Sequence, residues 1–149
     1  MQFVLLEDDP GQSDWLIDDL RSRSPKVDIQ LLTSEHEFRS ALDSFRGSQP
    51  DLFILDVMVR WTKPEPNMEL PSADAGKEKY FRAGVRCAEL LRREGFSTPI
   101  ILYTILENVD IHEDLERLRA ASDNIVYIRK ESTSEELLRQ IREKVKAVT

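Results

Sequence analysis

The chain lacks several features that would place it in a familiar class. It has one cysteine, Cys87, in 149 residues, so no internal disulfide can form, which is typical of a reducing compartment. Cys87 lies among apolar neighbours in a helical pattern, and we expect it to be buried. No apolar run approaches the roughly 20 residues that cross a bilayer, and the N-terminus has no basic and then apolar leader. We therefore expect a cytoplasmic protein with no membrane partner.

Basic charge is also scarce. The 21 lysines and arginines are outnumbered by 28 aspartates and glutamates, which gives a net charge of −7. Such a chain has no basic field to attract a phosphate backbone, so we expect no nucleic-acid partner. The composition, 40% hydrophobic and 33% charged, is ordinary for a globular protein. The length suits one domain over residues 1–149.

Short apolar runs alternate with helical patterns along the chain. The runs predict strands at Gln2–Leu6, Ile29–Leu32, Leu52–Val57, Ile100–Tyr103 and Ile125–Ile128. Trp15, Leu16 and Leu20 fit one face of a first helix, and Phe38, Leu42 and Phe45 fit one face of the next, which follows a capping box at Ser34–Glu37. Further helices are predicted from Phe81 to Glu94, around Leu115 and Leu118, and from about Thr133 onward. This alternation predicts an α/β fold, a doubly wound five-stranded parallel sheet with helices on both faces.

One connection breaks the rhythm. Residues 60–80 contain Pro64, Pro66 and Pro71, whereas a strand-to-helix connection of this kind usually has about 2–6 residues. We expect an insertion here. It is either a lid or partner-recognition element, or a disordered segment that is tolerated at small entropic cost.

Acidic residues follow two of the predicted strands. Asp56 ends an almost wholly apolar run, and a strand buried on both faces should not end in a carboxylate without a reason. Glu7, Asp8 and Asp9 follow the first strand, although Asp9 alone is equally well explained as a helix cap. If the two strands are neighbours, these like charges need a cation, a proton or a basic side chain between them.

Two more strand ends carry polar residues, Thr104 and Lys130. With these, the chain resembles the receiver domain of two-component response regulators, apart from the insertion. The motifs that carry the resemblance are Leu5-Leu6-Glu7-Asp8, Leu55-Asp56-Val57-Met58, Tyr103-Thr104 and Arg129-Lys130. The resemblance implies a flavodoxin-like sheet with the strand order 2-1-3-4-5, an order of which this family is a standard example.

The resemblance also implies a function. Asp56 would accept a phosphoryl group from a phosphohistidine of a sensor histidine kinase or a histidine phosphotransfer protein, assisted by Thr104 and Lys130. Mg²⁺ would be held by Asp8, Asp56, the Met58 carbonyl and, through a water, Glu7.

The resemblance further implies that phosphorylation changes the surface that binds a downstream partner. Thr104 and Tyr127 would act as switch residues, and the fourth helix, fifth strand and last helix would contact an unknown downstream protein or a second copy of the chain. We expect a single-domain receiver that signals by contact and is not an enzyme beyond its own phosphorylation and dephosphorylation. As a lone strand tyrosine, Tyr127 would instead be plain core.

The sequence departs from the family pattern in three places: Glu131 replaces a proline, Ile105 replaces a small residue, and residues 60–80 replace a short turn. The bulk of Ile105 should slow phosphoryl transfer and hydrolysis. Two alternatives stay open. One is a pseudo-receiver that binds partners without phosphorylation. The other is an aspartate-nucleophile phosphohydrolase, which would need a second aspartate at the position of Met58.

Overall fold

A parallel sheet of five strands forms the centre of the molecule, and its strand order is β2-β1-β3-β4-β5. The computed structural model describes residues 1–62, 82–131 and 134–146. The strands are β1 (Gln2–Leu6), β2 (Asp28–Leu32), β3 (Leu52–Leu55), β4 (Ile100–Thr104) and β5 (Ile125–Arg129). The fold class and strand order expected from the sequence are confirmed.

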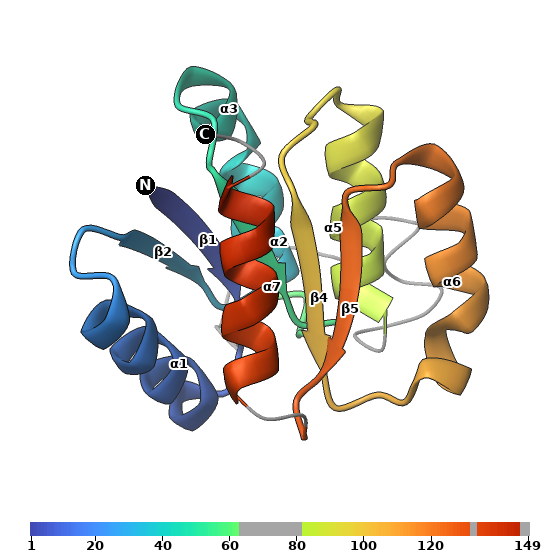
Figure 1. Cartoon of the computed structure of the whole chain (residues 1–149). Coiled ribbons are helices and arrows are strands. Elements are labelled where there is room, and N and C mark those ends of the chain that lie inside the picture. The colour runs from blue at the N-terminus through green and yellow to red at the C-terminus, as the bar shows by residue number, and fades with distance from the viewer. Residues whose placement is uncertain (63–81, 132–133, 147–149) are drawn as a thin grey trace.

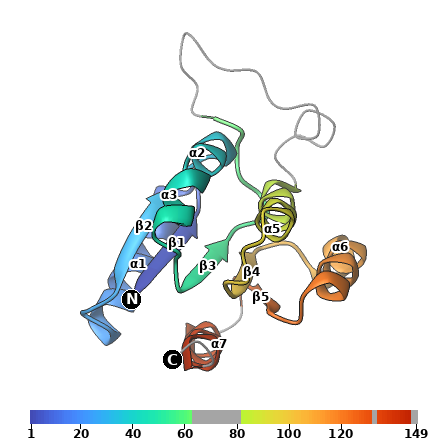
Figure 2. The same ribbon diagram turned by 90° about the horizontal axis from the view of Figure 1, so that it is seen from above.

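Helices cover both faces of this sheet (Figure 1). On one face lie α1 (Pro10–Arg23) and α7 (Ser134–Lys146), and on the other lie α2 (Glu35–Ser40), α3 (Leu42–Gly47), α5 (Ala83–Arg93) and α6 (Asn108–Ala121). Figure 2 shows these two layers from above, with the sheet running between them. Among the described residues, no helix is long and apolar enough to cross a membrane.

The core divides along the sheet because successive strand residues point to opposite faces. In β1, Phe3 and Leu5 pack with apolar residues of α1 and α7. Val4 and Leu6 pack on the other face with apolar residues of α2, α3, α5 and α6. Every residue of β3 is buried, which explains its continuous apolar run.

Two helices differ from the sequence-based expectation. The helix expected around Phe38, Leu42 and Phe45 is two short helices, α2 and α3, which meet at Ala41. Phe38 and Phe45 are buried all the same, because the apolar spacing suits one helix or two. In α1, Leu16 and Leu20 face the sheet as expected, but Trp15 is 47% exposed, so its assignment to that face was wrong. One residue along a helix is a turn of about 100°, which carries Trp15 away from the sheet.

Helix ends follow local side-chain chemistry. The Ser34 hydroxyl accepts a hydrogen bond from the Glu37 main-chain N–H at 3.1 Å, as the capping box predicts. A Glu37 carboxylate oxygen accepts from the Thr33 N–H at 2.9 Å, one residue before the N–H that the reciprocal bond of a capping box uses. Gly95 follows α5 with a φ of +86°, which confirms the predicted end of that helix.

Part of the predicted insertion and two predicted helix starts, Phe81 and Thr133, lie outside the described residues. The described chain stops at Thr62 and resumes at Arg82, so residues 63–81 lie outside it. Thr133 is likewise outside, and the last helix is described from Ser134. Cys87 lies within α5 and is fully buried, as expected.

Gly84 allows α5 to approach the end of β3 closely. Its N–H donates to the Val57 carbonyl at 3.1 Å. A Cβ at this position would lie 2.2 Å from the Asp56 carbonyl oxygen and 2.8 Å from the Val57 Cα. These are main-chain atoms, which cannot swing aside as a flexible side chain can.

Replacing Gly84 by alanine should therefore destabilise the protein by at least about 2 kcal/mol. Urea unfolding measures this change. Gly47→Ala is the matched control, since a Cβ there would meet nothing within 4 Å, and it should be neutral or stabilising by up to about 1 kcal/mol. An equal loss of stability in both variants would contradict this account of Gly84.

Candidate functional site

The carboxyl ends of four strands bring the predicted site residues to one edge of the sheet. Glu7 and Asp8 follow β1, Asp56 follows β3, Thr104 ends β4 and Lys130 follows β5. Main-chain hydrogen bonds extend the sheet up to these residues, from the Asp56 N–H to the Leu6 carbonyl and from the Lys130 N–H to the Thr104 carbonyl, both at 2.9 Å. The site residues thus begin where the regular sheet pairing ends.

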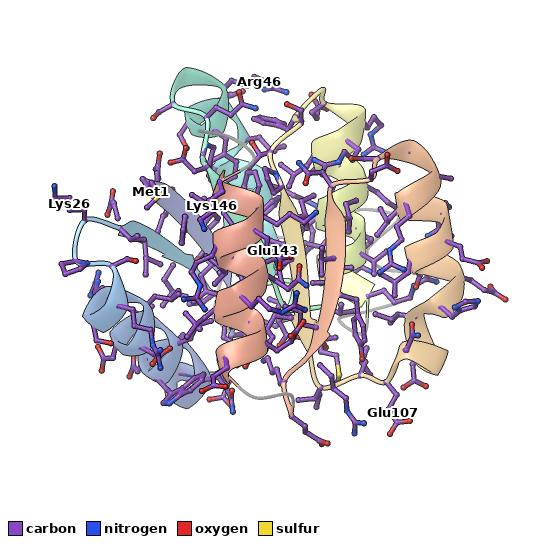
Figure 3. All side chains as sticks on the ribbon, viewed as in Figure 1. Met1, Lys26, Arg46, Glu107, Glu143 and Lys146 are labelled. Carbon is purple, nitrogen blue, oxygen red and sulfur yellow. The ribbon has the colours of Figure 1, made fainter. Side chains whose placement is uncertain are left out.

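Figure 3 shows this edge from the side. Glu107, in the loop after β4, lies at the carboxyl end of the sheet, whereas Met1, Lys26 and Lys146 lie at the opposite end. The candidate site is therefore remote from both described chain ends.

Lys130 is the centre of the site. Its Nζ donates to Oδ2 of Asp56 at 2.9 Å and also to Oε2 of Glu7. All three side chains are almost fully buried, with 7% of Lys130, 7% of Asp56 and 5% of Glu7 exposed. One ammonium group thus bridges two carboxylates that come from adjacent strands.

Burial and charge shift the acid–base behaviour of this cluster. Burial, and then the charge of Asp56, raise the pKa of Glu7 above its ordinary value, against the lowering effect of Lys130. Burial alone would lower the pKa of Lys130, but the Asp56 charge and the hydrogen bonds to both carboxylates outweigh it and raise that pKa. Lys130 therefore stays charged at neutral pH.

Asp8 faces a different cation. Its Oδ2 accepts hydrogen bonds from the Arg60 main-chain N–H at 3.1 Å and from Arg60 Nε at 3.3 Å. Its side chain is 22% exposed, so it lies at the rim of the site. The structure thus joins Glu7, Asp56 and Lys130 in one cluster and pairs Asp8 with Arg60 beside it. The sequence alone did not point to Arg60, since nothing in the order of residues reveals which acid a loop arginine will meet.

The oxygen donors near Asp56 suit a hard divalent cation such as Mg²⁺, which binds through few carboxylates and keeps several waters. Oδ1 of Asp56 accepts from the Met58 N–H at 3.1 Å, so Met58 is held against the aspartate. In the part of the chain that the structure describes, however, no three His, Cys, Asp or Glu side chains gather closely enough to hold a metal ion. The donors fit by their chemistry, while each carboxylate is paired with a donor from the protein itself.

Asp9 belongs to the helix rather than to the site. Its Oδ1 accepts from the N–H groups of Gly11 at 2.9 Å and Gln12 at 3.3 Å, which confirms its interpretation as the N-cap of α1. Its own N–H donates to Glu7 Oε1 at 3.0 Å, so the cap also helps to hold the buried glutamate.

Thr104 and Tyr127, the two predicted switch residues, meet through one residue between them in space. The Thr104 hydroxyl, fully buried, accepts from the Leu106 N–H at 3.4 Å, and the Tyr127 hydroxyl donates to the Leu106 carbonyl at 2.5 Å. Thr104 is not the cap of the following helix, because Glu107 holds that position in α6. The bridge is made by main-chain atoms of Leu106, which is why no side-chain pattern could have revealed it.

Ile105 and Glu131, the two single residues that depart from the family pattern, directly follow the site residues Thr104 and Lys130. Ile105 is 56% exposed directly after Thr104. Glu131 forms an ion pair with Arg129 at 2.9 Å, and the described residues contain no cis peptide bond.

Solved structures with this fold are numerous, although no family model and no curated protein matches the sequence. A response regulator receiver protein from Pseudoalteromonas atlantica matches with a TM-score of 0.70 and 16% identity over 100% of both chains. The BeF3-activated receiver domain of Klebsiella pneumoniae RstA matches with a TM-score of 0.67 and 22% identity, over 97% of this chain and 98% of that one. Thermotoga maritima TrrA, solved in complex with Mg²⁺-BeF, matches with a TM-score of 0.64 and 22% identity, over 96% and 97%. The chain has the receiver-domain fold.

Replacing Lys130 by methionine should destabilise the protein most at neutral pH. The variant leaves Glu7 and Asp56 without their shared cation in a buried site, which costs about 3 kcal/mol in the free energy of unfolding. The pKa of Glu7 is raised in the folded chain above its ordinary value of 4.5. The free energy of unfolding therefore falls as the pH rises above 4.5, because Glu7 must ionise in a buried site. Without Lys130 that pKa rises further and the reduction grows.

The difference between variant and wild type should therefore be largest near neutral pH and shrink toward pH 4.5, because a glutamate whose pKa is raised above 4.5 is mostly protonated there in the folded chain. Urea unfolding at both pH values tests this. Lys26→Met, at an exposed position, should show a small effect of equal size at each pH. A loss in Lys130→Met that does not depend on pH would count against the carboxylate pairing.

Proposed function

We propose that this chain is a phosphoacceptor switch of a two-component phosphorelay. Asp56 takes a phosphoryl group from a phosphohistidine on a sensor histidine kinase or a histidine phosphotransfer protein. The observation that carries the proposal is the buried pair of Lys130 and Asp56, 2.9 Å apart, at the carboxyl edge of a receiver-fold sheet. The domain extends over residues 1–149, with the insertion as a part of it, and acts in the cytoplasm.

The chemistry is an exchange of two bonds to phosphorus. A carboxylate oxygen of Asp56 attacks, the P–N bond of the phosphohistidine breaks, and the imidazole leaves with the bonding electrons and takes up a proton. Negative charge spreads over the phosphoryl oxygens in the transition state, so positioned cations do most of the catalysis. Lys130 is already beside Asp56 and can follow the charge from the carboxylate to the phosphoryl group.

Mg²⁺ belongs to this proposal as well. Asp8, Asp56 and the Met58 carbonyl would hold it, with Glu7 acting through a water. When bound, it supplies positive charge to the phosphoryl oxygens. Support comes from the donor chemistry of these residues and from a receiver-fold relative, Thermotoga TrrA, solved with Mg²⁺-BeF.

Phosphorylation would act on the surface through Thr104 and Tyr127. A phosphoryl group adds about −1.5 to −2 charges and three acceptor oxygens. The Thr104 hydroxyl would then give up its contact with Leu106 and donate to a phosphoryl oxygen. Tyr127 shares the same Leu106, so the surface of α6, β5 and α7 would change with it. A downstream protein, or a second copy of the chain, would bind there. The chain acts in signalling and turns over no substrate beyond its own phosphoryl group.

The second candidate is a pseudo-receiver that binds its partner without phosphorylation. The pairing of Asp8 with Arg60 favours it, since that carboxylate is already neutralised. A phosphohydrolase has no such support, because Met58 occupies the position of its general acid.

Treatment with acetyl phosphate and Mg²⁺ should add one phosphoryl group to the wild type, measured by intact mass spectrometry. Asp56→Asn should give no adduct, because an amide is a poor nucleophile toward phosphorus. Asp28→Asn, at an exposed aspartate of β2, should be modified like the wild type. An unmodified wild type would favour the pseudo-receiver, and consumption of acetyl phosphate without an adduct would favour a phosphohydrolase.

Ile105 is expected to slow the loss of the phosphoryl group by restricting the approach of water. Ile105→Ala should shorten the half-life of the phosphorylated form by roughly threefold, about 0.6 kcal/mol in activation free energy. Asn108→Ala, another exposed position on this side of the molecule, controls for a general disturbance of the loop. A half-life that is unchanged or longer in Ile105→Ala would refute this role.

A further inference from the structure

Arg60 is hydrogen-bonded to the carboxylate of Asp8, which is a proposed ligand of the metal ion. Its main-chain N–H and its Nε both donate to the same oxygen, Oδ2 of Asp8, at 3.1 Å and 3.3 Å. The contact joins residues 52 positions apart in the sequence, so it is made by the fold and not by local chain geometry. It belongs to no motif of the sequence.

Helix α2 fixes the main chain from which Arg60 reaches Asp8. The first N–H groups of that helix, from Glu35 and His36, donate to the carbonyls of Arg60 at 2.9 Å and Trp61 at 2.8 Å. The first N–H groups of a helix have no carbonyl partner within the helix, so they can bind carbonyls of another segment. The Trp61 ring packs against His36, with ring centres 5.7 Å apart, and lies 5.8 Å from the guanidinium of Arg39. Arg60 is thus positioned by a helix, not by a free loop.

A buried ion pair holds α2 itself in place. Glu35 is fully buried, and Arg86 of α5 donates to it with Nη2 at 2.7 Å. Arg39 donates to the same carboxylate at 2.9 Å. Since breaking a buried pair leaves an uncompensated charge, this contact resists displacement of α2. Arg60 therefore stands on a rigid support next to Asp8.

The charges at the site divide between two internal cations. Lys130 pairs with Glu7 and Asp56, and Arg60 pairs with Asp8. Three carboxylates against two basic side chains leave an excess of one negative charge. A divalent cation on Asp8 would have to share an oxygen with the Arg60 guanidinium, and two positive charges so close repel one another.

We propose that Arg60 is a built-in counter-ion of Asp8 that competes with Mg²⁺ and so sets the metal affinity of the site. The inference rests on the proposed function, because it assumes that Asp8 is a metal ligand. Without metal, Arg60 neutralises Asp8 and stabilises the resting state. Metal binding releases the guanidinium and removes one of the contacts that hold the segment after β3.

Isothermal titration calorimetry of the full chain with MgCl2, at constant ionic strength, tests this role. Arg60→Ala should bind Mg²⁺ about two- to fivefold more tightly than the wild type, the range expected from one partly exposed ion pair. Arg23→Ala is the matched control, since Arg23 is also partly exposed and pairs with a single aspartate, Asp19. It changes the net charge equally and should leave the affinity unchanged.

The thermal unfolding midpoint is a second readout, and like the first it does not depend on phosphorylation. Mg²⁺ should raise the thermal unfolding midpoint more in Arg60→Ala than in the wild type, because a tighter ligand stabilises the folded state more. The Arg60 side chain is 46% exposed, so the variant should fold, and its far-ultraviolet circular dichroism should match that of the wild type. Adding Asp8→Asn to Arg60→Ala should remove the gain in affinity.

Each outcome decides one of two questions. Tighter binding by Arg60→Ala, or binding by that variant alone, supports the counter-ion role. Equal or weaker binding by Arg60→Ala overturns it and leaves the proposed function standing. A gain that survives Asp8→Asn overturns it too, since the effect would then be general charge. No Mg²⁺ binding by either protein overturns this role together with the magnesium part of the proposed function.

Discussion

Two carboxylates and one ammonium group at the edge of the sheet depend on each other. Glu7 and Asp56 stand at the ends of neighbouring strands and repel one another, and Lys130 reaches them from the end of β5 and donates to both. A buried charge without a partner would cost several kcal/mol, so each of these strands must end at the correct residue. Placing β1 beside β3 at the centre of the sheet is what makes the arrangement possible.

A second set of charges secures the helices on the opposite face from α1 and α7. The Glu35 and Arg86 pair joins α2 to α5, and these helices lie on either side of residues 63–81 in the sequence. Trp61, at the end of the described segment before that gap, accepts a hydrogen bond from α2. The described segments on both sides of residues 63–81 are therefore attached to the same short helix. The polar site and the described start of the insertion share one support, because Arg60 and Trp61 both accept hydrogen bonds from α2.

Much of the fold could be read from the sequence, because strands that are buried on both faces leave continuous apolar runs. The run Gln2–Leu6 matches β1, and the run Leu52–Val57 contains β3, which ends two residues earlier at Leu55. The strand order followed from the family resemblance. Apolar spacing could not reveal the break at Ala41, since Phe38 and Phe45 reach the core in either arrangement.

The site was less accessible to sequence reasoning. Residues after strand ends could be grouped, because parallel strands share an edge, and that grouping included Lys130 beside Asp56. The partner of Asp8 could not be found, since a salt bridge across 52 residues leaves no local pattern. The atoms that link Thr104 to Tyr127 are equally hidden, because every residue carries the same main-chain groups.

That link has a consequence for how the protein tolerates change. Because Leu106 joins Thr104 and Tyr127 with its backbone N–H and C=O, any residue that keeps the apolar packing of its side chain against the core would preserve the connection. Adding or deleting one residue between Thr104 and Leu106 would instead shift both groups out of reach. This position should therefore accept other apolar residues but no change in loop length, so insertion or deletion variants would reveal the connection more clearly than apolar substitutions.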